Sequence, residues 1–306
     1  MAYPERSYEG ESKLRAAMKL GHNAFKWAAE QVSLPVLLGE YFKPETGSDY
    51  RVGLARKLRL ALRMARNESK IIGASRHLEH LLMATQILNV PRSSSGCAVE
   101  CGSYKGRSAA NLSLACALCE RRLEIFDSFE GLPKPSEEDL THSLPYLREL
   151  HRYSKGAYAG SLDEVKQNIR RYGDADHCNF NVGFFEQTLP DFHNDCIFVF
   201  ADVDLRDSLK ICIRFLWPLL RDGCYFFVHE ASHREIASLF FDDPWWRSCI
   251  GCAAPGLVGA GTGLGLFPAS GGFLSNLGYT IKNVSHSQFR IAPQTGSSEE
   301  RAASLL

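Results

Sequence analysis

Five short segments with the composition of β-strands recur between residues 97 and 228, and helical patterns separate them. The two most apolar runs, CIFVFA (196–201) and CYFFV (224–228), are far too short to cross a bilayer. Runs of this kind are typical of strands that are buried on both faces of a parallel sheet. Alternating strands and helices predict an α/β fold, with helices on both faces of the sheet. The five segments are CAVEC (97–101), RLEIFD (122–127), CNFNV (178–182), IFVFAD (197–202) and GCYFFV (223–228).

The chain is expected to divide into three parts. Residues 1–71 show no strand pattern and are predicted to form a helical N-terminal extension, which covers a site or mediates homo-oligomerisation. Its basic amphipathic segment, 51–66, is interpreted as a solvated basic face packed on a partner helix, not as a membrane-surface helix. Residues 72–293 are predicted to form the α/β domain, closed by strands at 277–283 and 287–292, and residues 294–306 a disordered tail.

The charge balance and the cysteines indicate which kinds of partner and which cellular compartment to expect. Thirty-five basic residues balance thirty-five acidic ones, so we expect no nucleic-acid partner and no membrane partner. The polar N-terminus lacks the apolar region of a secretory signal. Most of the ten cysteines stand singly in apolar stretches, and the two C-x-x-C pairs, at 116–119 and 249–252, are too far apart for an ordinary zinc site. We therefore expect core thiols in a cytoplasmic protein.

The loop after the first strand contains glycines where a ligand would approach the backbone. Glu100, Gly102 and Gly106 follow an E-x-G-x-x-x-G pattern, with Tyr104 between the glycines. In parallel α/β sheets, ligands bind at the carboxyl ends of the strands, near the point where the strand order reverses. The loop lacks G-x-G-x-x-G and the P-loop pattern, which disfavours a dinucleotide or nucleoside triphosphate site.

Asp127 ends the second strand, in the stretch EIFDSFEGLP (124–133). A carboxylate at this strand tip can accept hydrogen bonds from both ribose hydroxyls of a nucleoside that lies over the first strand. Alternatively, Asp127 simply caps the turn that follows it. A ribose-binding acid together with one glycine-rich loop, without a diphosphate cradle, favours S-adenosylmethionine over NAD.

The motif DSFEGLP (127–133) resembles a hallmark of the macrocin O-methyltransferase family, which methylates sugar hydroxyls of macrolide and related antibiotics. The resemblance continues in order to residue 283, so it covers about 72–283. It implies a class I methyltransferase fold, Rossmann-like with a mostly parallel seven-stranded sheet. It also implies S-adenosylmethionine as methyl donor, with Ser128 and Phe129 beside Asp127 at the cofactor. The further matching stretches are LHRY (150–153), VKQNIRRYG (165–173), GFFEQTLP (183–190), DVDL (202–205), WPLLRDGCYFFVHE (217–230) and LGYTIKN (277–283).

The family often binds a divalent cation near the acceptor, through carboxylates in a D-G-D and a D-D motif. This chain has Asp202-Val203-Asp204 at the first place and His229-Glu230 at the second. Asp202, His229 and Glu230 are therefore candidate ligands, and a histidine shifts the preference from magnesium toward transition metals. Alternatively the metal is lost and His229 serves as the base. Asp202 is expected to contact the cofactor as well, whereas Asp204 is interpreted as a cap of the following helix.

Three further residues are candidates on weaker grounds. His151 lies in the long segment 128–160, which is expected to fold over the acceptor as a lid, and an imidazole is a suitable general base for a hydroxyl. Phe184 and Phe185 follow the third strand and line either an adenine pocket or the core. The glycine-rich stretch 259–266 comes too late in the chain for a phosphate loop and is interpreted as a flexible connection.

These residues together predict an O-methyltransferase that transfers a methyl group from S-adenosylmethionine to a small-molecule hydroxyl, on a sugar or a glycosylated natural product. His151, Asp202 and His229 are the expected catalytic residues, and Glu100 and Tyr104 are expected near the methionine part of the cofactor. The alternative is a protein of the same fold that binds the cofactor without turnover and serves as a partner or scaffold.

Overall fold

The fold is described by a computed structural model, which covers residues 21, 38–137, 139, 142–143, 150–151, 153–231, 233–259 and 275–283. For 142–143 and 150–151 it describes the backbone alone. The helices are η1 (Ser48–Tyr50), α2 (Leu54–Glu68), α3 (His77–Asn89), α4 (Arg107–Leu118), α5 (Leu162–Tyr172), η3 (Ala175–His177), α6 (Phe185–Thr188), η4 (Leu189–Asp191), α7 (Arg206–Leu219), α8 (Arg234–Leu239) and α9 (Asp243–Cys249). The strands are β1 (Cys97–Cys101), β2 (Leu123–Asp127), β3 (His142–Ser143), β4 (Leu150–His151), β5 (Cys178–Val182), β6 (Cys196–Ala201), β7 (Leu220–Val228) and β8 (Gly278–Ile281).

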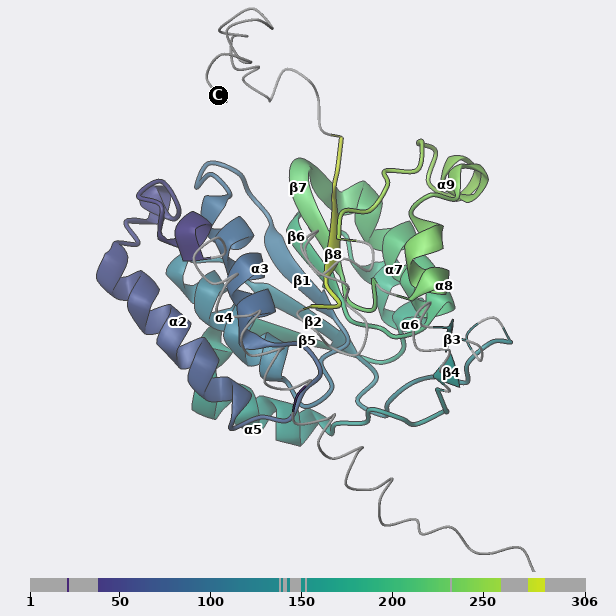
Figure 1. Ribbon diagram of the computed structural model, residues 1–306, viewed down its shortest axis with the longest axis horizontal. Coiled ribbons are helices and arrows are strands. Elements are labelled where there is room, and N and C mark those ends of the chain that lie inside the picture. The colour runs from purple at the N-terminus through teal and green to yellow at the C-terminus, as the bar shows by residue number, and fades with distance from the viewer. Residues whose placement is uncertain are drawn as a thin grey trace, which may run out of the picture.

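The main sheet has six strands in the order β5-β2-β1-β6-β7-β8 (Figure 1). The first five are parallel, and β8 runs antiparallel to β7. All five expected segments form these parallel strands. The sequence predicted seven strands, whereas the described part of the chain contains six in this sheet. The predicted strand 287–292 lies outside the described residues, as do the expected connection at 260–266 and the tail.

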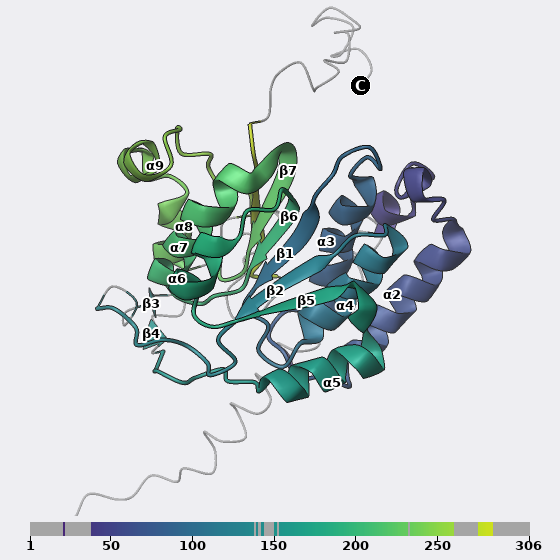
Figure 2. The ribbon, with the colours of Figure 1, turned by 180° about the vertical axis from the view of Figure 1, so that it is seen from behind.

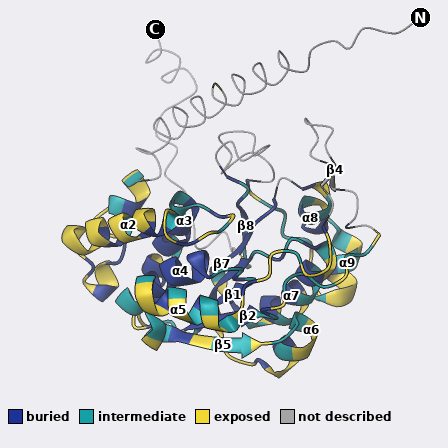
Figure 3. Cartoon of the chain, turned by 90° about the horizontal axis from the view of Figure 1, so that it is seen from below, coloured by how far each residue is buried: buried dark blue, intermediate teal, exposed yellow. Residues whose placement is uncertain are grey.

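Helices cover both faces of the sheet, as predicted. Helices α2 to α5 lie on one side and α6 to α9 on the other (Figures 1 and 2). The central strands β1 and β6 are buried along their whole length. Exposed residues concentrate on the outer faces of helices such as α2 and on the edge strand β5 (Figure 3). All ten cysteines are free thiols and eight of them are buried, which agrees with core packing. No described helix is both long and apolar enough to cross a membrane.

Helix α2 packs onto the same hydrophobic core as the sheet. Leu60 and Met64 of this helix are buried in that core, while its arginines lie on the exposed face, as the basic amphipathic pattern predicted. Residues 1–20 and 22–37 lie outside the described part of the chain, so the covering or oligomerising role of the extension stays a prediction.

A buried polar chain joins α2 to the helices beneath it. Asn67 donates to Asn111 of α4 (2.8 Å), Asn111 contacts Nδ1 of His80 in α3 (2.7 Å), and Nε2 of His80 contacts the Ser75 hydroxyl (2.9 Å). Burial lowers the pKa of His80 to about 3, so this ring is neutral and has one donor and one acceptor nitrogen. These hydrogen bonds therefore fix the segment before α3 relative to α4.

Met64→Ala tests whether α2 belongs to the folding unit. The side chain is fully buried, so we expect the free energy of unfolding in urea to fall by about 2–5 kcal/mol. The matched control is Leu62→Ala in the same helix, whose side chain is 57% exposed. It should change stability by no more than about 0.5 kcal/mol. Equal effects of the two substitutions would contradict the packing of α2.

Candidate active site

A cavity of about 330 Å³ opens at the carboxyl ends of the parallel strands. Its walls come from the loops after β1, β2, β5, β6 and β7, from the segment 73–75 before α3, and from parts of the long segment after β2. The sheet order reverses between β1 and β6, so the cavity lies at the position where α/β sheets bind ligands.

Glycine at position 102 permits a close approach of two strand ends. A Cβ atom there would lie 2.0 Å from the carbonyl oxygen of Asp202, and Gly102 has a φ of +83°. The amide of Asp202 donates to the carbonyl of Cys101 at 2.9 Å, which continues the β1–β6 pairing to this point. Gly106, at the N-cap of α4, also has positive φ, and a Cβ there would lie 2.9 Å from Val165. Both glycines predicted from the loop are thus required by the backbone.

Asp127 joins the loop after β1 to the turn after β2. Its Oδ2 accepts hydrogen bonds from the amide (2.6 Å) and the hydroxyl (2.9 Å) of Ser103, and its Oδ1 accepts one from the amide of Phe129 (2.7 Å). Asp127 therefore does cap the turn that follows it, as the alternative interpretation expected. Asp127 also lines the cavity, and a carboxylate has about four acceptor positions, so capacity remains for a ligand hydroxyl.

The rest of the DSFEGLP motif shapes this turn. Ser128 lines the cavity, and its hydroxyl donates to the carbonyl of Gly131 (3.1 Å). Phe129 has a φ of +59°, and its side chain is buried against Phe180 and does not line the cavity. Phe129 therefore contributes to the turn through its backbone, and its contact with the cofactor stays a prediction.

Glu100 is a buried carboxylate whose oxygens have no hydrogen-bond partner among the described residues. Its side chain is fully buried in β1, and neither oxygen bonds to a described residue, although the Ser108 hydroxyl lies nearby. Burial raises the pKa of Glu100 to about 8, and the carboxylates of Asp202 and Asp127 add to the rise. An unpaired buried acid is costly, so Glu100 fits a site whose missing partner is a hydrogen-bond donor or a cation.

Aromatic side chains form much of the remaining wall. Phe184 and Phe185, at the start of α6, both line the cavity, and Phe185 also packs against the core, so their role at the adenine stays a prediction. Tyr104 lines the cavity too, with its ring 5.9 Å from that of Tyr158. Tyr153 packs against Tyr158 at 6.2 Å. The two latter tyrosines come from the segment that was expected to act as a lid.

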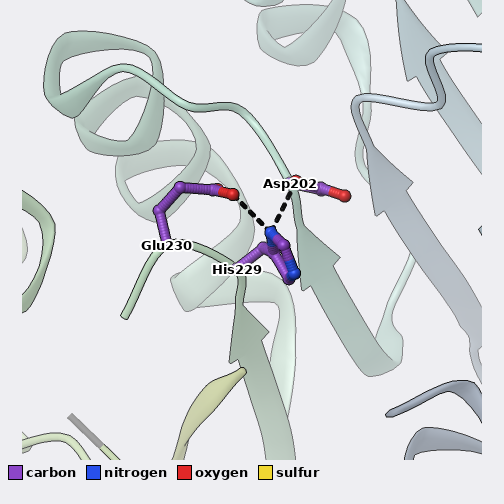
Figure 4. Close-up of side chains that lie close together, drawn as sticks. All are labelled: Asp202, His229 and Glu230. Atoms are coloured by element: carbon purple, nitrogen blue, oxygen red, sulfur yellow. Dashed lines mark hydrogen bonds and ion pairs between the residues drawn. The ribbon is translucent and has the colours of Figure 1, made fainter. Parts of the chain in front are cut away.

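Three side chains from the ends of β6 and β7 converge at the cavity (Figure 4). His229 Nδ1 lies 3.4 Å from Asp202 Oδ1, and it also forms a hydrogen bond with Glu230 Oε1. One ligand atom from each residue lies within 4.8 Å of the others. The sequence predicted this group, and the structure brings its members together.

Burial and mutual repulsion shift the protonation of the cluster. Burial raises the pKa of Asp202 to about 7, and that of Asp204 to about 7. Burial also raises the pKa of Glu230. For His229, burial alone lowers the pKa, but Glu230 and Asp202 outweigh it and hold the pKa well above its usual range. In this arrangement the imidazole is therefore positively charged between its carboxylates.

Asp204 does not cap the following helix, contrary to the expectation. It lines the cavity with a φ of +59°, and its side chain forms a hydrogen bond with Tyr153. The first amide of α7, that of Arg206, donates to the Asp139 side chain (2.8 Å). Asp139 is fully buried and belongs to the long segment after β2, so the segment itself supplies the cap.

Several cavity residues escaped the sequence analysis. His233 and Asn276 line the cavity beside Tyr153, and Glu79 lies behind His229. None stands at the end of a strand, so only tertiary packing identifies them. Tyr153 had a signal, because it ends the LHRY motif. His151 lies in β4, which pairs with His142 of β3, but its side chain lies outside the described part of the structure and its catalytic role stays a prediction.

Comparison with known proteins identifies the family. A family model described as macrocin-O-methyltransferase (TylF) matches residues 45–243, well over half of the chain. The chain belongs to the macrocin O-methyltransferase family. This confirms the resemblance seen in DSFEGLP and in the later motifs up to residue 230, whereas LGYTIKN (277–283) lies beyond the matched residues. The family match begins before the boundary that was expected near residue 72 and includes α2.

Two solved structures are similar to this family member. The O-methyltransferase NovP is 20% identical with a TM-score of 0.50, and the match covers 84% of this chain and 99% of that one. The calicheamicin methyltransferase CalS11 is 16% identical with a TM-score of 0.49, covering 74% of this chain and 93% of that one. The NovP match shows that the fold is that of a methyltransferase. Curated protein sequences include no significant match.

Asp204→Asn tests the raised pKa of this carboxyl. A carboxyl with a folded-state pKa of about 7, far above its unfolded value of about 4, binds more protons in the folded state between those limits. The wild-type protein therefore loses stability as the pH rises from about 4 to about 7. Asparagine resembles the protonated acid, so the variant should be the more stable protein at about pH 8, and this advantage should shrink toward about pH 4.

The measurement is urea unfolding of both proteins across this pH range. Asp176→Asn, at an exposed position outside the cavity lining, is the control for replacing a carboxylate with an amide. A constant difference between Asp204→Asn and wild type would show that the Asp204 carboxyl is not perturbed.

Proposed function

We propose that this protein transfers a methyl group from S-adenosylmethionine to a hydroxyl of a small molecule, a sugar or a glycosylated natural product. The observation that carries the proposal is the shared cavity that joins Asp127 and Gly102 to the cluster of Asp202, His229 and Glu230. Family membership supports O-methyl transfer, and NovP, whose fold this chain shares, is an O-methyltransferase.

The cofactor has a chemically matched place along the first three strand tips. The Asp127 carboxylate would accept hydrogen bonds from the ribose hydroxyls, and Phe184 and Phe185 would cover the adenine. The unpaired Glu100 carboxylate lies in the strand below Gly102 and is suited to the positive end of the methionine part. These residues would bind and orient the cofactor, and S-adenosylmethionine supplies the methyl group.

The protein's contribution to rate is mainly the alignment of two bound reactants. Holding both in line for transfer can be worth about 7–11 kcal/mol. Deprotonation of the acceptor adds a smaller factor. Because His229 is already charged in this arrangement, the carboxylates of Asp202 and Asp204 are better placed to accept the hydroxyl proton than the ring is. This assigns His229 an electrostatic role instead of that of the base.

The same cluster has the donor set of a divalent cation site. Asp202, His229 and Glu230 would hold the ion, because one ligand atom of each lies within 4.8 Å of the others. A bound cation would polarise the acceptor hydroxyl. The imidazole favours manganese, zinc or iron over magnesium.

The test of the function is methyl transfer from labelled S-adenosylmethionine to a pool of hydroxylated metabolites and glycosides. Parallel reactions contain magnesium, manganese, zinc, iron or a chelator, and calorimetry with S-adenosylhomocysteine measures cofactor binding. Labelled product supports the proposal. Clear binding without labelling under all conditions would support the scaffold alternative, and absence of binding would reject both.

Asp127→Asn should weaken the binding of S-adenosylhomocysteine by about 10- to 100-fold. The change keeps the size of the side chain and one acceptor oxygen but removes the charge, and hydrogen bonds to charged groups are worth about 1.5–3 kcal/mol. Calorimetry gives the affinity, and thermal unfolding shows whether the turn survives. Asp176→Asn should bind like the wild type. An unchanged affinity in a folded Asp127→Asn protein would remove the basis for the ribose assignment.

A further inference from the structure

The two nitrogens of the His229 ring face different surroundings. Figure 4 shows one ring nitrogen directed at both Asp202 and Glu230, and the other pointing away from them. This second nitrogen, Nε2, lies 3.8 Å from Oε1 of Glu79. The His229 and Glu79 side chains are 6% and 3% exposed, so water screens their interaction little.

Glu79 is a fixed carboxylate in the first turn of α3. Its Oε2 accepts a hydrogen bond from the amide of Arg76 (2.5 Å), in a capping box. Its Oε1 accepts from the hydroxyl of Ser275 (2.6 Å) and the amide of Asn276 (3.3 Å). Three donors from two distant parts of the chain therefore hold the carboxylate in place behind the ring.

We propose that Glu79 is a positioning residue, which holds the His229 ring with Nδ1 directed at Asp202 and Glu230. At 3.8 Å the contact is too long for a direct hydrogen bond, so it acts by charge attraction in a buried place. The charged ring donates from Nδ1 to Glu230 and directs its second N–H, on Nε2, toward Glu79. If a cation took the place of the Nδ1 proton, the proton on Nε2 would stay toward Glu79 and the Nδ1 lone pair would face the ion. Carboxylates commonly orient metal-binding histidines in this way.

The need for a positioning residue follows from the histidine at position 229, where the D-D motif of the family has an aspartate. An aspartate has two equivalent oxygens, whereas an imidazole has two different nitrogens and needs a partner that selects one of them. The inference deepens the proposed function, because the site it positions is the one assigned to the acceptor and a cation. The state of the ring is nevertheless measurable without any methyl transfer.

Glu79→Gln separates charge from structure. Glutamine keeps an oxygen that can accept from Ser275 and Asn276, but it removes the negative charge beside Nε2. In protein labelled with ring-¹⁵N histidine, we expect the two nitrogen signals of His229 to shift or broaden in the variant, while those of His177 stay unchanged. His229→Gln assigns the signals. Titration with Mn²⁺ alone, followed by calorimetry, should show about 10-fold weaker binding in Glu79→Gln.

Two further variants keep the test decisive. Glu124→Gln changes another buried carboxylate, bonded to Asn179 and Asn181 on the β5 side of the sheet, and should leave the His229 signals and Mn²⁺ binding unchanged. Ser275→Ala loosens the hold on Glu79 and should move the His229 signals in the same direction but less, which covers the case that Glu79→Gln does not fold.

Unchanged His229 signals in folded Glu79→Gln would overturn the proposal, even if the melting temperature fell, because the role would then be structural alone. If the wild type takes up no Mn²⁺, the nitrogen signals decide by themselves. If the wild-type protein does not bind S-adenosylhomocysteine, the proposed function is rejected. The nitrogen signals of His229 would still test the orientation of its ring.

Discussion

The contact between Gly102 and the carbonyl of Asp202 determines the geometry on which the other cavity residues depend. Because no Cβ separates them, the ends of β1 and β6 approach closely at the point where the strand order reverses. Asp127 then connects the loop after β1 to the turn after β2 through Ser103 and Phe129. The expected cofactor residues and the charged cluster thus share one cavity through backbone packing, before any ligand contributes.

The charged cluster destabilises the fold, and its surroundings offset part of this destabilisation. Asp204 and Glu230 both have positive φ, a strained backbone conformation for residues other than glycine. Asp202 and Asp204 have raised pKa values because burial disfavours their charged forms, while the His229 imidazolium stabilises its neighbours. A buried group of this kind is weak evidence for stability and fits a functional site better.

The helices before the first strand are part of the site. The polar chain from Asn67 to Ser75 fixes the segment that forms one wall of the cavity, and Glu79 lies directly behind His229. Arg107 binds the same segment through the carbonyls of Gly73 and Ser75. Asn67 belongs to the predicted extension, 1–71, so these hydrogen bonds join the extension to the cavity wall, whereas Glu79 lies in the predicted domain, 72–293.

The sequence by itself determined the α/β class, the five parallel strands, the family, and the placement of Gly102, Asp127, Asp202 and His229 at strand ends. These follow because strand periodicity and turn chemistry are local, and parallel strands bring their carboxyl ends to one edge. Only the tertiary structure decided that Phe129 faces the core, that Asp139 caps α7 in place of Asp204, and that Glu79 lies behind His229. Those contacts join residues far apart in the chain, and their side chains are oriented by packing, which no local pattern encodes.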